Sequence, residues 1–224
     1  MVVIQARTSA KAPSGVRKPS DFQGYVLIPL SEFGLSLDSP ELDEWLQEFA
    51  GRNQDTVGDF EITSHGEVKI MSPTGIPGDW HEAEITAELV FRAREHGGRA
   101  GGPTSMFILP DGSMRCPDAW WMSAERWNSL PAASDRPFRA AVPDLLVEIV
   151  SPSNRGTGLT DKVRRYLEGG ARLVWVINAR QRCVTVYRPG AEAEILHEPD
   201  MLGGGDVLPG FAFNVRERIF ENVP

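Results

Sequence analysis

Cysteine and long apolar runs are both scarce in this chain of 224 residues. Its two cysteines, Cys116 and Cys183, lie far apart and form no CxxC pair, so neither a disulfide framework nor a zinc site is predicted. No apolar run approaches the roughly 20 residues that span a bilayer. Residues 1–20 also lack the continuous apolar stretch of a signal peptide. We therefore expect a cytoplasmic protein without a membrane segment.

Positive charge is in short supply as well. The chain has 23 Lys and Arg residues against 31 Asp and Glu residues, and its net charge is −8. Proteins that hold nucleic acid by bulk electrostatics are usually basic, because neutralising phosphates supplies most of the non-specific affinity. Any contact with DNA would need a local basic patch, a metal ion or a partner subunit.

Several motifs that would identify a function are missing. The sequence contains no internal repeat, no Walker or dinucleotide-binding fingerprint and no HExxH motif. Function must therefore be inferred from individual polar residues and from the elements that carry them.

The order of the expected elements indicates one α/β domain. We expect a flexible arm over residues 1–20 and a single domain over 21–224. A mixed β-sheet flanked by helices is predicted, preceded by a helix and a hairpin. The apolar spacing predicts helices over 39–49, 77–96 and 159–167, and strands over 59–63, 67–71, 104–109, 114–122, 142–150, 173–178 and 183–188. The stretch 123–141, rich in proline and alanine, is expected to be a loop.

Two acidic residues occupy positions where an acid is unusual. Glu148 interrupts a near-continuous apolar run, 142–150, which is typical of a strand buried on both faces. Asp118 directly precedes another apolar strand. An ionised group buried in this way is costly unless it is paired, hydrogen-bonded or bound to a cation. Alternatively, Glu148 emerges at the strand end and caps the turn that follows.

Strand geometry limits which acids could share a metal ion. Asp144 and Glu148 point to the same face, but four residues at ~3.3 Å each place them about 13 Å apart. Two ligands of one Mg²⁺ ion lie within a few ångströms of each other, because each binds at about 2.1 Å. Glu148 therefore needs a partner from another strand, and Asp118 is the best-placed candidate.

A lysine and a histidine complete the candidate set. Lys162 is one of four lysines and opens the helix that follows the Glu148 strand. A lysine there could orient a water or offset developing negative charge, but it could also be an ordinary exposed residue. His81 lies on the inward stripe of its helix and could assist a water or a phosphate, as could Glu82 or Glu84. A core-edge histidine without a catalytic role is an equal alternative.

The polar residues and their surroundings resemble a known family. The run Pro143 to Ser153, then Lys162 and Tyr166, then Gly170 to Asn178, is similar to the Uma-two (Uma2) family of restriction-endonuclease-like proteins. Further similarities are the Arg115-x-Pro117-Asp118 motif, the helix that opens at His81 and the closing stretch 205–211, so that the resemblance covers roughly residues 57–215.

This resemblance implies a restriction-endonuclease-like core of the PD-(D/E)XK superfamily. It also implies that Asp118 and Glu148 are metal ligands and that the lysine role falls to Lys162, because Val150 stands two residues after Glu148. Gly158 replaces an aspartate that family members often carry four residues before the lysine, and Asp161 is a possible substitute.

The function that follows is a Mg²⁺-dependent endonuclease, with Mn²⁺ as a possible substitute and DNA as the expected substrate. We also expect a homodimer, because cutting two strands needs two sites. Two alternatives stay open at this point. One is a catalytically inactive module of the same fold that acts in dimerisation or partner binding. The other is a metal-dependent hydrolase acting on RNA or on a small molecule.

Overall fold

The computed structural model describes residues 25–53, 60–71, 75–131, 139–151 and 156–221. The predicted arm at residues 1–20 lies outside these ranges. Within them, none of the helices is long and apolar enough to cross a membrane.

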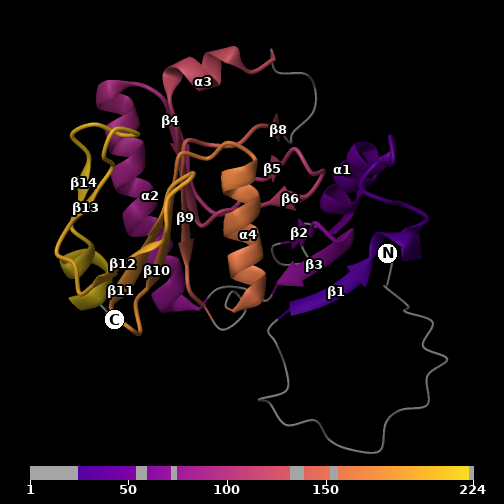
Figure 1. Cartoon of the computed structure of the whole chain (residues 1–224). Coiled ribbons are helices and arrows are strands. Elements are labelled where there is room, and N and C mark those ends of the chain that lie inside the picture. The colour runs from indigo at the N-terminus through magenta and orange to yellow at the C-terminus, as the bar shows by residue number, and fades with distance from the viewer. Residues whose placement is uncertain (1–24, 54–59, 72–74, 132–138, 152–155, 222–224) are drawn as a thin grey trace, which may run out of the picture.

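A mixed six-stranded sheet forms the centre of the molecule (Figure 1). Its strands are β4 (Arg99–Gly101), β7 (Ala119–Met122), β9 (Leu145–Ile149), β10 (Leu173–Asn178), β11 (Cys183–Tyr187) and β12 (Glu194–His197). They lie in the order β12-β11-β10-β9-β7-β4. Only the neighbours β9 and β10 run parallel, and the other pairs are antiparallel. The predicted mixed sheet is confirmed.

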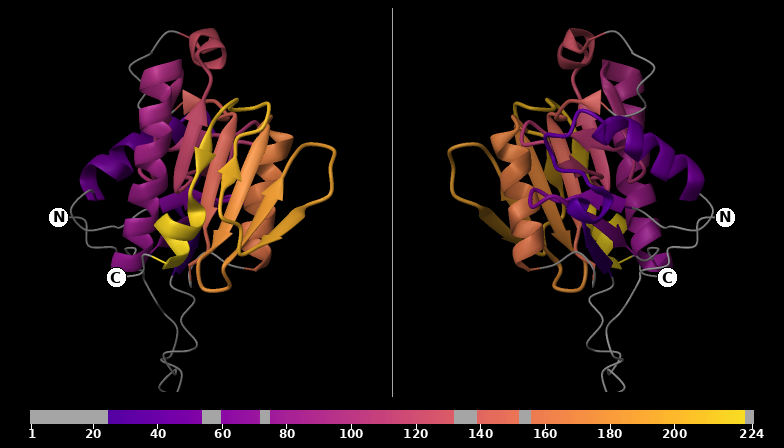
Figure 2. Two further views of the ribbon diagram at one scale, coloured as in Figure 1. Left: turned by 90° about the vertical axis from the view of Figure 1, so that its left-hand side faces the viewer. Right: turned by 90° about the vertical axis from the view of Figure 1, so that its right-hand side faces the viewer.

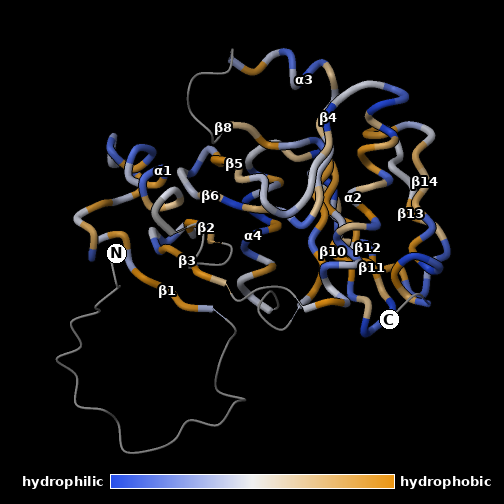
Figure 3. The backbone as a smooth tube through the Cα atoms, turned by 180° about the vertical axis from the view of Figure 1, so that it is seen from behind, coloured by the Kyte–Doolittle hydropathy of each residue, from blue (hydrophilic) through white to orange (hydrophobic). Residues whose placement is uncertain are grey.

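One long helix covers each face of this central sheet. Figure 2 shows α2 (Ile76–His96) on one side and α4 (Thr157–Glu168) on the other. Odd-numbered residues of β9, such as Val147, pack in the cluster that contains Ile85 and Leu89 of α2. Leu146 packs with Val163 of α4. Because both faces are covered, the strand is apolar along nearly its whole length. Figure 3 shows hydrophobic colouring at β10, the parallel neighbour of β9.

A second six-stranded sheet stands beside the first. Its strands are β1 (Tyr25–Pro29), β2 (Phe60–Ile62), β3 (Glu67–Met71), β5 (Phe107–Ile108), β6 (Met114–Arg115) and β8 (Arg139–Ala140), in the order β1-β3-β2-β6-β5-β8. The predicted hairpin is confirmed as β2 and β3. A short 3-10 turn, η2 (Leu30–Phe33), follows β1. The predicted N-terminal helix is α1 (Leu42–Asn53), which packs on this sheet through Leu42 and Leu46.

The remaining elements extend the packing on the α2 side. They are β13 (Leu202–Gly203), β14 (Ala212–Phe213) and the π-helical turn η3 (Arg216–Glu221). Leu202, Phe213 and Ile219 join the same apolar cluster as α2. None of these elements, nor β1 or β12, was predicted from the sequence.

Two predicted elements are wrong. The expected strand 114–122 is split into β6 and β7, which belong to different sheets. Pro117 lies between them and has no N–H to continue a ladder, so the chain leaves one sheet and enters the other at this point. The expected loop 123–141 contains α3 (Ala124–Ser129), because the Ser123 side chain accepts a hydrogen bond from Arg126 N and caps that helix. Residues 132–138 lie outside the described ranges.

The packing of α2 on the sheet can be tested with two isoleucines of the same helix. Ile85 is 0% exposed, whereas Ile76 is 77% exposed. We expect Ile85→Ala to lower the free energy of unfolding by roughly 2–5 kcal/mol, because it leaves a cavity in the core. Ile76→Ala should change it by less than about 0.5 kcal/mol. Urea unfolding followed by circular dichroism measures both; equal losses would show that α2 does not pack as described.

Candidate active site

Asp118 directly precedes the first residue of β7, and Glu148 is the fourth residue of the neighbouring strand β9. The last paired residues of β7 and β9 at this end are Ala119 and Val147. Asp118 lies one residue beyond the first and Glu148 one residue beyond the second. The Asp118 carboxylate accepts a hydrogen bond from Ile149 N, which fixes it against β9. Glu148 is fully buried, whereas Asp118 is half-buried.

Two side chains of α4 bind the Glu148 carboxylate. Lys162 Nζ lies 2.9 Å from both Oε1 and Oε2 of Glu148. The Tyr166 hydroxyl donates to Oε1 at 2.9 Å. Lys162 and Tyr166 are four residues apart and therefore lie on the same face of the helix. The Glu148 carboxylate is therefore buried against α4 and does not emerge to solvent at the strand end.

A second glutamate, Glu61 of β2, was missed by sequence reasoning. Its Oε1 lies 2.7 Å from Lys162 Nζ, and its Oε2 lies 3.5 Å from Nη1 of Arg115. Lys162 also donates to the carbonyl oxygen of Cys116 at 2.9 Å. The ammonium thus sits among two carboxylates and one carbonyl oxygen and is only 7% exposed. The predicted alternative of an exposed helix lysine is wrong.

Burial and mutual charge set the protonation of the cluster. Burial, followed by the charge of Glu148, raises the pKa of Asp118 well above its ordinary range. Burial also raises the pKa of Glu148, and Lys162 offsets this only in part. Burial would lower the pKa of Lys162, but the charges of Glu148, Glu61 and Asp118 outweigh it and raise that pKa. Burial would likewise raise the pKa of Glu61, but Lys162 and Arg115 reverse the effect and lower it.

Comparison with known proteins identifies the family. The sequence profile named Uma2, described as "Putative restriction endonuclease", matches residues 43–216. The chain belongs to the Uma2 family. No curated protein matches it. A crystal structure from Anabaena variabilis, described as that of "a putative nuclease belonging to DUF820", has the same fold with a TM-score of 0.65. It shares 20% identity, and the match covers 84% of this chain and 98% of that one.

The carboxylate oxygens of Asp118 and Glu148 in this Uma2 protein are of the type that magnesium ions prefer. Mg²⁺ is commonly bound by one or two carboxylates together with waters and substrate phosphates. Asp118 and Glu148 are such a pair, and a cation between them would offset both the burial and the Glu148 charge that raise the pKa of Asp118. Among the residues that the structure describes, no group of three or more His, Cys, Asp or Glu side chains could hold a metal ion. Waters or substrate would therefore complete the shell.

The structure does not bring His81 into this cluster. His81 is buried on α2 beside η3, where a hydrogen bond with the Ile219 backbone accompanies a pKa that burial lowers. Its neighbour Glu82 lies near enough to Asp118 for its charge to contribute, after burial and Glu148, to the raised pKa of Asp118. Glu84 instead forms an ion pair with Arg218 at 3.0 Å.

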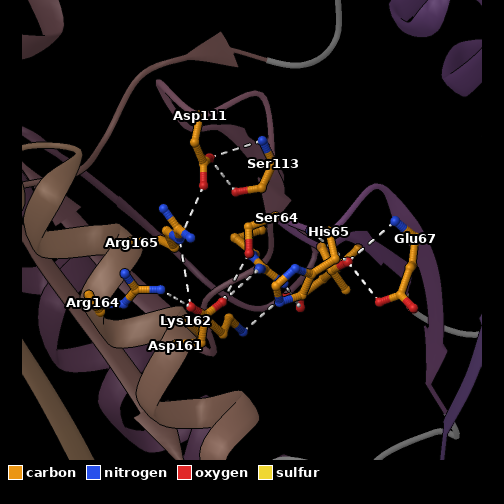
Figure 4. A network of polar contacts seen from close by, with 12 residues as sticks. Ser64, His65, Glu67, Asp111, Ser113, Asp161, Lys162, Arg164 and Arg165 are labelled. Atoms are coloured by element: carbon orange, nitrogen blue, oxygen red, sulfur yellow. Dashed lines mark hydrogen bonds and ion pairs between the residues drawn. The ribbon is translucent and has the colours of Figure 1, made fainter. Parts of the chain in front are cut away.

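The other two acids weighed from the sequence have structural partners. Asp144 accepts from Ser123 N at 2.8 Å and pairs with Arg126 at 3.1 Å, which anchors α3. Asp161 accepts from the Ser64 hydroxyl at 3.0 Å and from Arg164 at 2.5 Å, as Figure 4 shows. Asp161 therefore connects α4 to the hairpin turn, and it is not among the side chains that contact Lys162.

The burial of Asp118 and the nearby charge of Glu148 predict that a neutral replacement at position 118 stabilises the metal-free protein. A carboxyl whose pKa is raised on folding costs no stability below its unfolded pKa; the cost grows as the pH rises above that value and is complete above the folded pKa. We expect Asp118→Asn to raise the free energy of unfolding by on the order of 1 kcal/mol at pH 7 with EDTA present. The gain should shrink toward zero near pH 3.

Urea unfolding at the two pH values provides the measurement. Asp38→Asn is a suitable control, because Asp38 is an exposed aspartate, and it should leave the free energy of unfolding nearly unchanged at both pH values. Destabilisation by Asp118→Asn at pH 7 would mean that Asp118 is well compensated without a metal ion.

Proposed function

We propose that this Uma2 protein is a Mg²⁺-dependent endonuclease that hydrolyses phosphodiester bonds in DNA. The observation that carries the proposal is the pair of opposed carboxylates, Asp118 and Glu148, next to a buried lysine. The fold and the family agree with a nuclease. DNA as substrate and magnesium as cofactor are our inferences.

In this proposal each residue has a distinct role. Asp118 and Glu148 would hold Mg²⁺, or Mn²⁺ in its place. The ion supplies polarisation of the phosphoryl oxygen and a lower pKa for water. Asp118 is the more exposed of the two ligands, so it is the one that a phosphate would reach first. Tyr166 and Lys162 fix the Glu148 carboxylate so that it does not rotate.

Lys162 adds positive charge beside the reaction centre. Its ammonium has three N–H groups, and acceptors from Glu61, Glu148 and Cys116 surround it. In the described state it therefore acts through its charge on the negative phosphoryl group. Direct contact with a water or a phosphate oxygen requires Lys162 to exchange one of these partners.

The net charge of −8 agrees with this arrangement. Bulk attraction to DNA is weak for an acidic protein. Carboxylates that bind a divalent ion gain a local positive charge that can receive a phosphate. We therefore expect nucleic-acid binding to depend on the metal ion.

Cleavage of supercoiled plasmid tests the proposal. With Mg²⁺ or Mn²⁺ the native protein should nick the plasmid, and EDTA should abolish the reaction. Glu148→Ala should lower the rate by at least about 100-fold, because it removes a metal ligand and leaves Lys162 without a partner on β9. Glu168→Ala is the matched control, since Glu168 is an exposed glutamate of α4. Nicking that survives in Glu148→Ala would contradict the proposal.

Absence of cleavage by the native protein would favour the inactive-module alternative. Competition by RNA or by small phosphodiesters distinguishes the remaining hydrolase alternative from DNA cleavage.

We further propose that the active form is a homodimer, since cutting both strands of a duplex needs two sites. Light scattering should then give about twice the chain mass of 24.7 kDa at the concentration of the cleavage assay. A monomer that linearises plasmid by concerted double-strand cuts would contradict this proposal.

A further inference from the structure

Of the two glutamates that the described residues place in contact with Lys162 Nζ, Glu61 is the one that is not a proposed metal ligand. It comes from β2, in the sheet beside the central one, and is 0% exposed. Two basic side chains, Lys162 and Arg115, contact it from different elements.

The contacts of Glu61 extend to the backbone that carries Asp118. Its Oε1 accepts a hydrogen bond from Cys116 N at 3.0 Å. Lys162, which the same oxygen holds at 2.7 Å, donates to Cys116 O at 2.9 Å. Cys116 is thus held at both its N–H and its carbonyl group. Only Pro117 separates it from Asp118, and the proline ring restricts the backbone between them.

The charge of Glu61 also shapes the contacts of Lys162. Lys162 and Arg115 keep the pKa of Glu61 low despite its burial, so this carboxylate stays ionised at neutral pH. An ionised Glu61 shares the ammonium with Glu148. Without that charge, Lys162 would pair with Glu148 alone and compete more strongly with a cation for the same oxygens.

We propose that Glu61 is a positioning residue of the active site, which holds Lys162 and the Cys116 peptide so that Asp118 and Glu148 keep their opposed arrangement. This inference rests on the proposed function. It assigns to the neighbouring sheet a direct part in building the catalytic centre.

A purely structural ion pair is the competing explanation. Replacing a whole buried ion pair with apolar residues is often neutral, whereas removing one partner destabilises the fold because it leaves a buried charge uncompensated. A purely structural role for Glu61 therefore predicts a lower free energy of unfolding and an unchanged kcat. A positioning role predicts an effect on turnover and on the backbone next to Asp118.

The decisive variant is Glu61→Gln, which keeps the shape and removes the charge. Either orientation of the new amide places its NH₂ group against a donor, either Arg115 on one side or Lys162 and Cys116 N–H on the other. We expect kcat to fall about 10- to 100-fold, the range for loss of groups that orient metal ligands. KM for a short duplex should stay within about twofold.

Two comparisons make this result specific. Glu67→Gln changes a glutamate of the same hairpin that hydrogen-bonds Thr63, and it should leave kcat unchanged. In a Lys162→Gln background, Glu61→Gln should lower kcat by no more than about twofold further, because the two residues act together. Full additivity of the two substitutions, or an unchanged kcat in Glu61→Gln, would overturn the proposal.

A second readout does not need activity. The backbone amide of Ile149 donates to Asp118, and the amide of Cys116 donates to Glu61. In Glu61→Gln, the ¹H–¹⁵N resonances of both amides should shift and exchange faster with solvent, whereas Glu67→Gln should leave them in place. If the native protein cleaves nothing, the proposed function fails, yet a moved Ile149 amide still supports positioning. An Ile149 amide that does not move overturns it.

Discussion

The candidate site depends on the buried ammonium of Lys162. Desolvating a lysine is costly, and the cost is offset here by Glu148 and Glu61, two glutamates from different sheets that raise its pKa. The positive charge of the same ammonium reduces the repulsion between the buried carboxylates of Glu148 and Glu61, which both contact it. Removing Lys162 would leave the buried carboxylates of Glu148 and Glu61 without this positive charge. Both the packing of the two sheets and the arrangement of the candidate site therefore depend on Lys162.

The two sheets meet at this charge. The central sheet supplies Asp118 and Glu148, α4 supplies Lys162 and Tyr166, and the neighbouring sheet supplies Glu61 and Arg115. Pro117 marks the point at which the chain crosses from one sheet to the other. The crossing places Arg115 and Cys116 beside Glu61 and places Asp118 opposite Glu148. A strand that continued through 114–122 could not serve both sheets.

Asp118, Glu148 and Lys162 could be proposed from the sequence, because a strand that is buried on both faces is almost entirely apolar and an acid within it is conspicuous. Glu148 stood out as an acid in an apolar strand. A spacing of about 13 Å along that strand separated it from Asp144. In the structure Asp144 anchors α3. Glu61 could not be found in this way. It alternates with Phe60 and Ile62, and an acid at that position is typical of the solvent-exposed face of a strand. Its burial arises from tertiary packing against α4 and β6, which local periodicity does not report.

The most direct test is a crystal structure of the protein soaked in Mn²⁺, with data collected to record anomalous scattering. The account predicts one strong anomalous peak between the carboxylates of Asp118 and Glu148, at about 2.1–2.2 Å from an oxygen of each. Lys162 should still contact both Glu61 and Glu148. A Mn²⁺ site elsewhere, or none at a concentration that supports cleavage, would contradict the assignment of these two carboxylates as the metal centre.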